Sequence, residues 1–192
     1  MKTAFVANGL VLLASLGCSN DNATSPDSSN ARGPNSVTPP VSLDGPLAIS
    51  LDNEGRFAEG WGWKLDIESD LSANLEIRTF PEATTRAFNL ENAQIEELRA
   101  VLVEERFFEL NDEYGELVAD GSTQTITVRC GSASKTVRLH YLMNWVHGNP
   151  SKLVDPSRAV RVWMLVRGWF NDEDAVDLER YDQMVVDAVA KL

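Results

Sequence analysis

The side chains that could carry catalysis are few and lie far apart along the chain. Ser132 and Lys135 match the Ser-x-x-Lys spacing, in which a lysine one helical turn away takes the proton of a serine nucleophile. Here the Ser-Ala-Ser-Lys segment follows Gly131 in a sequence typical of a hairpin turn, and no Ser-Asp-Asn or Lys-Thr-Gly element accompanies it. We therefore expect no serine acylase chemistry from these residues.

His140 and His147 are the only histidines of the chain, and they could serve a metal or a catalytic triad. Neither has a second imidazole or a thiolate at the two-to-four residue spacing of zinc ligands, so a metal site would need distant carboxylates. Neither has a Ser or Cys partner that the sequence can nominate for nucleophilic catalysis. The sequence predicts one histidine at a strand end and one in a loop.

The densest acidic cluster spans residues 171–174 and Asp177, and its carboxylates could offer oxygen ligands to calcium. It lacks the glycine and the final glutamate of a twelve-residue calcium loop, so we predict a solvated linker between two helices. Cys130 alternates with Val128 on the apolar side of a predicted strand, where a thiol behaves as a small hydrophobic group. We predict no catalytic residues, no metal and no cofactor, and we expect that the protein is not an enzyme.

Two longer loops are better candidates for a binding function. Residues 111–116 and 141–150 exceed what a tight connection needs, and each places an aromatic side chain among polar ones. Aromatic residues on loops often anchor a partner. Tyr114, Trp145 and His147 are therefore the predicted ligand-binding residues. The alternative, that Trp145 packs beneath a helix, stays open at this stage.

Hydrophobic periodicity predicts the elements that would position these residues. Alternating apolar residues predict strands at 61–68 and 75–78, a shorter strand at 86–90, and a hairpin with strands near 126–130 and 137–141. Apolar residues at three- and four-residue steps predict helices at 92–106, 155–170 and 178–191. The predicted fold class is α+β, an antiparallel β-sheet built from two hairpins with helices packed on one face. No glycine-rich phosphate loop joins a strand to a helix, so a nucleotide cofactor is not expected.

The first eighteen residues indicate where the protein resides. Lys2 precedes an apolar run from Ala4 to Leu16 that is shorter than the ~20 residues of a membrane span, as in a secretory signal. The following Gly17 and Cys18 resemble the lipobox of bacterial lipoproteins, although Ser15 stands where that family has a branched aliphatic residue. The resemblance implies a lipidated Cys18 and an extracytoplasmic protein anchored to a bacterial membrane of the cell envelope. An ordinary secretory signal is the alternative.

Composition divides the remainder into a tether and one domain. Residues 19–47 are rich in Ser, Asn, Asp, Thr and Pro and poor in large apolar residues, which predicts a disordered tether. Residues 48–192 then form the single predicted domain. Without residues 1–18 the chain keeps 16 of its 17 basic and all 29 acidic residues, a net charge of −13 instead of −12. Such a surface repels nucleic acid and anionic headgroups, so we expect no nucleic-acid partner and membrane contact through the lipid alone.

Several strings between residues 55 and 141 resemble small bacterial domains of the emfourin type. The strings are residues 55–60, Leu98, residues 107–110, Asp120, residues 125–128 and residues 135–137. Emfourin-type proteins inhibit a thermolysin-like metalloprotease, but the family's Gly-Gly-Phe-Ala-Gly start is altered here by Arg56 and Glu59. The sequence thus predicts a non-catalytic binding domain on a membrane-anchored lipoprotein, with an envelope protein or a protease as the possible partner. The alternative is an inhibitor of a secreted thermolysin-like metalloprotease.

Overall fold

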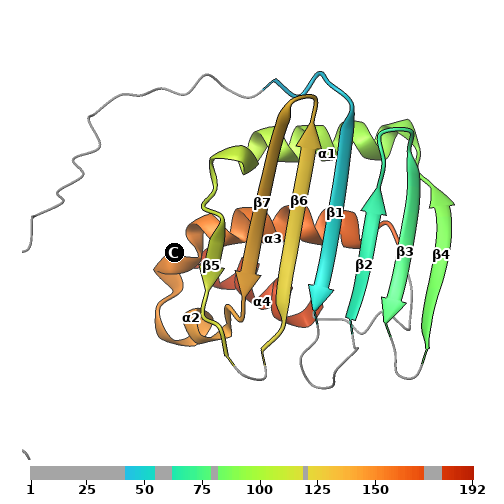
Figure 1. Cartoon of the computed structure of the whole chain (residues 1–192). Helices are drawn as coiled ribbons and strands as arrows, with labels where there is room; N and C mark the ends of the chain where they lie inside the picture. The colour runs from blue at the N-terminus through green and yellow to red at the C-terminus, as the bar shows by residue number, and fades with distance from the viewer. Residues whose placement is uncertain (1–41, 55–61, 79–81, 119–120, 171–178) are drawn as a thin grey trace, which may run out of the picture. The chain divides into compact units, whose positions relative to one another are not determined.

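The computed structural model describes residues 42–54, 62–78, 82–118, 121–170 and 179–192. The described residues form a mixed α/β fold around one seven-stranded sheet of order β4-β3-β2-β1-β6-β7-β5 (Figure 1). The strands are β1 Leu47–Glu54, β2 Gly62–Ile67, β3 Ser72–Arg78, β4 Ala83–Asn89, β5 Glu113–Gly115, β6 Thr123–Cys130 and β7 Ala133–His140. The helices are α1 Asn92–Glu104, α2 Met143–Gly148, α3 Val154–Arg167 and α4 Glu179–Val189, with 3-10 turns η1 Phe107–Glu109 and η2 Pro150–Leu153.

The sheet differs from the predicted one at its centre and at one edge. The central strand β1 pairs antiparallel with β2 and with β6, although the sequence predicted no strand there and assigned Leu47 to the tether. At the edge, β5 pairs parallel to β7 because α1 carries the chain across the sheet before β5 begins. The predicted pairs β2–β3 and β6–β7 are antiparallel, but the sheet as a whole is mixed and not the purely antiparallel one that the sequence predicted. The prediction of strands and helices in one α and β fold is confirmed.

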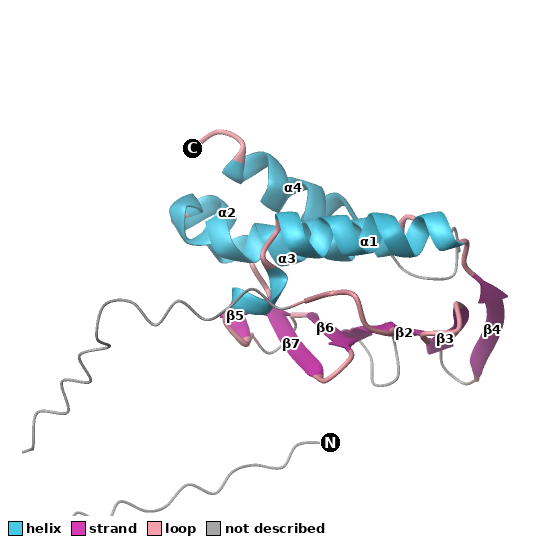
Figure 2. Ribbon diagram, turned by 90° about the horizontal axis from the view of Figure 1, so that it is seen from above, coloured by secondary structure: helices cyan, strands magenta, loops and turns pink. Residues whose placement is uncertain are grey.

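The helices cover one face of the sheet, and the core lies between the two layers (Figure 2). Alternate residues of the strands point into this core, where Trp63 packs against Trp163 with ring centroids 4.9 Å apart and against Phe170 at 5.2 Å. Burial of each such aromatic side chain contributes on the order of 1.5–3 kcal/mol. The opposite face is polar, with pairs such as Lys64 with Asp66 and Thr127 with Thr136.

The predicted helices at 92–106, 155–170 and 178–191 correspond to α1, α3 and α4 within a few residues at each end. A reciprocal capping box of Glu91 and Gln94 starts α1, and Arg106 follows its end in the left-handed region at φ 48°. The predicted loop 141–150 instead contains α2, so His147 lies on a helix and not in a loop. His140 ends β7, as predicted.

Arg99 on α1 fixes the chain where it enters β1. Its guanidinium donates to the backbone oxygens of Leu43 and of Gly45, the latter at 2.9 Å, and lies 3.8 Å from the Cys130 sulfur. Gly45 also packs against Gly131. A Cβ added to Gly45 would lie 2.9 Å from the Gly131 backbone nitrogen. These contacts place the start of the domain at the end of the sheet that holds the β6–β7 turn. Cys130 is 2% exposed, which confirms its predicted place in the core.

Candidate functional site

The described residues that could carry catalysis are kept apart by the fold. His140 is 8% exposed, and its Nδ1 lies 3.2 Å from the Thr123 hydroxyl oxygen. Lys135 binds Asp112, with 2.6 Å between its Nζ and the carboxylate Oδ1, and this contact holds the pKa of Asp112 below its usual range. Within the described parts of the chain, no group of three or more His, Cys, Asp or Glu side chains is placed to hold a metal ion. The acidic cluster at 171–177 and Cys18 lie outside the described residues.

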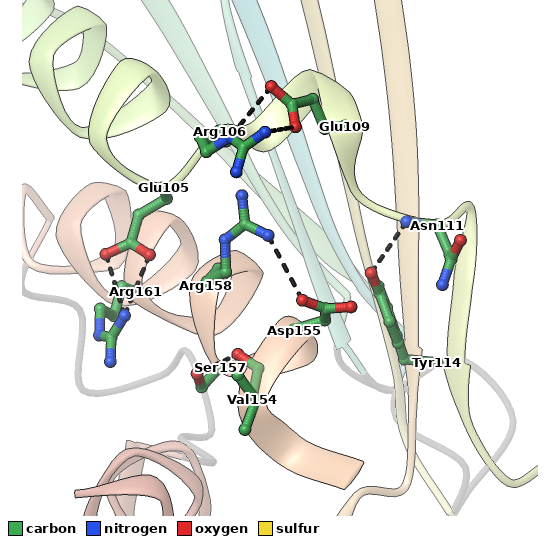
Figure 3. Close-up of polar contacts among 10 residues, drawn as sticks. All are labelled: Glu105, Arg106, Glu109, Asn111, Tyr114, Val154, Asp155, Ser157, Arg158 and Arg161. Carbon is green, nitrogen blue, oxygen red and sulfur yellow. Dashed lines mark hydrogen bonds and ion pairs between the residues drawn. The ribbon is translucent and has the colours of Figure 1, made fainter. Parts of the chain in front are cut away.

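Tyr114 lies in the core and not on a loop surface as the sequence predicted. It occupies the middle of β5 with 8% of its surface exposed. Its hydroxyl accepts a hydrogen bond of 2.8 Å from the Asn111 backbone nitrogen (Figure 3). Burial raises the pKa of the phenol, and the nearby Asp155 carboxylate adds to that rise. Tyr114 thus holds the segment that leads into β5 through Asn111 and offers little surface to a ligand.

A charged cluster joins the end of α1 to the start of α3 beside Tyr114. Glu105 is 7% exposed, and one Nη of Arg161 donates to both of its carboxylate oxygens at 3.1 and 3.0 Å. Arg106 pairs with Glu109, and both side chains are more than half exposed. Figure 3 shows Glu105 facing Arg161 of α3, whereas Arg106 and Glu109 lie on the same segment after α1. The Glu105–Arg161 pair therefore links the end of α1 to α3.

The second group of polar contacts surrounds Trp145. Glu116 accepts hydrogen bonds from Asn144 Nδ2 at 3.1 Å and from Trp145 Nε1 at 3.2 Å. On the ring of Trp145 lies the Lys152 ammonium, 5.3 Å from the centroid, in a cation–π contact. His147 is exposed on the same short helix. We call these five residues the α2 corner.

The α2 corner is held in one geometry by its own contacts. The hydrogen bonds from Asn144 and then Trp145 hold the pKa of Glu116 below its usual range, and the charge of Lys152 acts in the same direction. The Glu116 carboxylate is therefore ionised at neutral pH and restrains both donors. Trp145 also packs partly against the core, so one part of its ring is buried and another remains accessible. A restrained aromatic side chain loses little entropy on binding.

Gly115 directs Glu116 toward Trp145. Its φ of +92° is a conformation that side chains with a Cβ rarely adopt, and an added Cβ would lie 1.6 Å from the His140 backbone oxygen. Only glycine therefore permits β5 to end this close to β7. The chain then turns so that the Glu116 carboxylate reaches α2, which follows β7 in the sequence.

Apolar residues next to the α2 corner add contact surface. Leu117, directly after Glu116, is 68% exposed, and Tyr141, which follows β7, is 39% exposed. Val118 and Tyr141 both contact Gly121. A Cβ added to Gly121 would lie 2.3 Å from a Val118 methyl and 3.0 Å from the Tyr141 Cβ. A cluster of aromatic, apolar and restrained polar side chains is typical of protein recognition sites.

The structure separates the three residues that the sequence proposed for binding. Trp145 and His147 lie at the surface of α2, and Tyr114 points into the core. Sequence analysis did not single out Glu116 or Lys152. The Glu116 to Trp145 contact spans 29 residues, and no local pattern encodes it.

Comparison with known proteins adds no family to this description. No protein-family model matches the chain, and no curated protein matches it. Where the structure describes the strings that resemble emfourin-type domains, most of their apolar residues are core positions: Leu98, Phe107, Leu110, Ile126, Val128 and Val137. Phe108 is partly buried. In the described residues, no helix is long and apolar enough to cross a membrane.

Proposed function

We propose that this protein is a membrane-anchored bacterial lipoprotein whose extracytoplasmic domain binds a protein partner through the α2 corner, without catalysing a reaction. The lipobox-like ending at Cys18 and the polar composition of residues 19–47 support the anchor and the tether. A lipid anchor contributes about 0.8 kcal/mol per buried methylene, so several acyl chains hold a protein on a membrane.

The observation that carries the binding proposal is the pair of hydrogen bonds from Asn144 and Trp145 to Glu116. These bonds fix an aromatic side chain at the surface, beside the exposed side chains of Leu117 and Tyr141. Truncation of an aromatic anchor at a protein interface costs on the order of 2 kcal/mol or more. Loss of Trp145 should therefore weaken binding by about thirtyfold or more, since 1.4 kcal/mol is a factor of ten.

Capture from detergent-solubilised envelope tests the binding surface. The full chain, its Trp145→Ala variant and a Trp169→Ala control are each used as bait. Both tryptophans are partly buried against the core, but they lie beyond opposite ends of α3, a 14-residue helix about 21 Å long. We expect a specific partner that the wild type and Trp169→Ala retain and Trp145→Ala loses. Equal capture by all three forms would refute the proposal that the partner binds through the α2 corner.

Separate measurements test the anchor and the absence of catalysis. Metabolic labelling with a palmitate analogue should label the wild-type chain and not its Cys18→Ser variant. Label on neither form would contradict the anchor without affecting the binding proposal. Hydrolytic turnover of a simple substrate by the purified chain would contradict the non-catalytic role. Slowing of a thermolysin-like protease by micromolar protein would favour the inhibitor alternative, which rests on the sequence resemblance.

A further inference from the structure

The edge strand β4 presents a long open edge of the sheet. Among the described residues, β4 stands at one end of the sheet order, and Figure 1 shows it as the outermost strand on the side opposite β5. Six of its seven residues are exposed, and Phe88 is partly buried. Its pairing with β3 runs without interruption from Ser72 opposite Asn89 to Arg78 opposite Ala83. An exposed edge carries backbone N–H and C=O groups that can pair with a further strand.

The devices that usually protect such an edge are sparse in β4. Edges are commonly blunted by short length, charges, proline or a bulge. The opposite edge strand β5 is three residues long, whereas β4 has seven residues, a regular register and no proline. Arg86 is its one charged residue. β4 can therefore pair with another strand, in a register that does not place a second positive charge opposite Arg86.

We propose that two copies of this chain pair antiparallel through β4 and form one continuous sheet across the two domains. The register of the two β4 strands follows from the faces on which their side chains lie and from the charge of Arg86. Thr84, Arg86 and Phe88 lie on the helix side of the sheet, because they pair with the core residues Ile77, Leu75 and Ala73. Pairing centred on Arg86 would place two like charges opposite each other, which is destabilising.

Pairing centred on Ala87 avoids the like charges and adds an attraction. In this register Arg86 of each copy lies opposite Phe88 of the other, so that two cation–π contacts form on the helix side. Ala87 meets its own counterpart on the polar face, where small side chains allow close approach. The five residue pairs from 85 to 89 bury less than the ~1,200 Å² of a standard interface, so the dimer is weak in dilute solution. On a membrane, as the proposed anchor implies, tethering raises the effective concentration and favours the same contact.

Disulfide trapping tests the dimer without needing the lipid. The full chain carrying Cys18→Ser receives Ala87→Cys, is oxidised at high protein concentration and is analysed on a non-reducing gel. Opposed residues of antiparallel strands have Cα atoms about 4.5–5.5 Å apart, within the range that a disulfide spans. We expect a covalent dimer. Cys130 is buried, so the parent chain without the added cysteine should form no disulfide and should run as a monomer on the same gel.

Ala83→Cys is the matched control, since Ala83 is exposed on the same face of the same strand. In the proposed register its counterpart lies eight residues away, about 27 Å, too far for a bond. Cross-linking of both variants at equal rates would indicate random collision and refute the dimer. Preferential cross-linking through Thr85→Cys would refute the register, and absence of any cross-link would refute the proposal. Circular dichroism checks that each variant folds.

Discussion

Replacement of Gly115 by alanine should destabilise the protein and disconnect the α2 corner. The added Cβ would lie 1.6 Å from the His140 oxygen, whereas real Cβ contacts essentially never fall below 3.0 Å, so a shift of at least 1.4 Å (3.0 − 1.6) is required. Such a shift separates the end of β5 from β7 and carries Glu116 away from Trp145.

The magnitude follows from two contributions. An alanine at φ +92° is in a sparsely populated backbone region, which costs about 1–3 kcal/mol. The steric clash can be relieved by undocking the end of β5, so its cost is limited to one or two backbone hydrogen bonds at about 1 kcal/mol each. We therefore expect a loss of about 2–5 kcal/mol, a large part of the 5–15 kcal/mol that stabilises a typical domain.

Urea denaturation followed by circular dichroism measures this loss of stability. Gly148→Ala is the control, a glycine replacement that should not destabilise the protein. Gly148 ends α2, and an added Cβ there has no atom within 4 Å. The control should be neutral or gain about 0.4–1 kcal/mol, because alanine restricts the unfolded chain. If Gly115→Ala unfolds at the wild-type midpoint, the argument from the backbone at Gly115 is refuted.

Two further predictions concern the charged contacts. Arg161→Ala leaves the nearly buried Glu105 carboxylate without its cation and should cost about 1–3 kcal/mol in urea denaturation. Arg106→Ala removes an exposed pair and should cost less than about 1 kcal/mol, so equal losses would contradict the assigned burial. Because folding lowers the Glu116 pKa below 4.5, its contact with Trp145 should persist at neutral pH and be lost as the pH falls through the lowered value. The Trp145 indole N–H signal in NMR should report this transition, and a signal that stays unchanged through complete protonation of the Glu116 carboxylate would contradict it.

Helices α1, α3 and α4 and most strands could be predicted because their signals are local. The three- and four-residue spacing of Ile95, Leu98 and Leu102 places one apolar face on α1 whatever it packs against. In β2, the alternation of apolar and polar residues likewise places Trp63 and Leu65 on one face of the strand. β1 was missed although Leu47, Ile49 and Leu51 alternate, because its apolar run directly follows a polar segment assigned to the tether.

The candidate site could be predicted only in part. The length and aromatic content of residues 141–150 drew attention to Trp145, which the structure places at the surface of α2. The same argument failed for Tyr114, because a three-residue strand such as β5 has no periodicity to detect. Its burial depends on the core, to which distant segments contribute.

The sequence alone determined helices α1, α3 and α4, most of the strands and their apolar faces, the acidic charge and the lipobox-like start, since each depends on residues close together in the chain. Tertiary structure decided that β1 is central, that β5 runs parallel to β7 and that Glu116 restrains Trp145. These features join segments tens of residues apart, and their free energy arises from contacts that exist only after the chain has folded. For the same reason the open edge of β4 became visible only when the strand order was known.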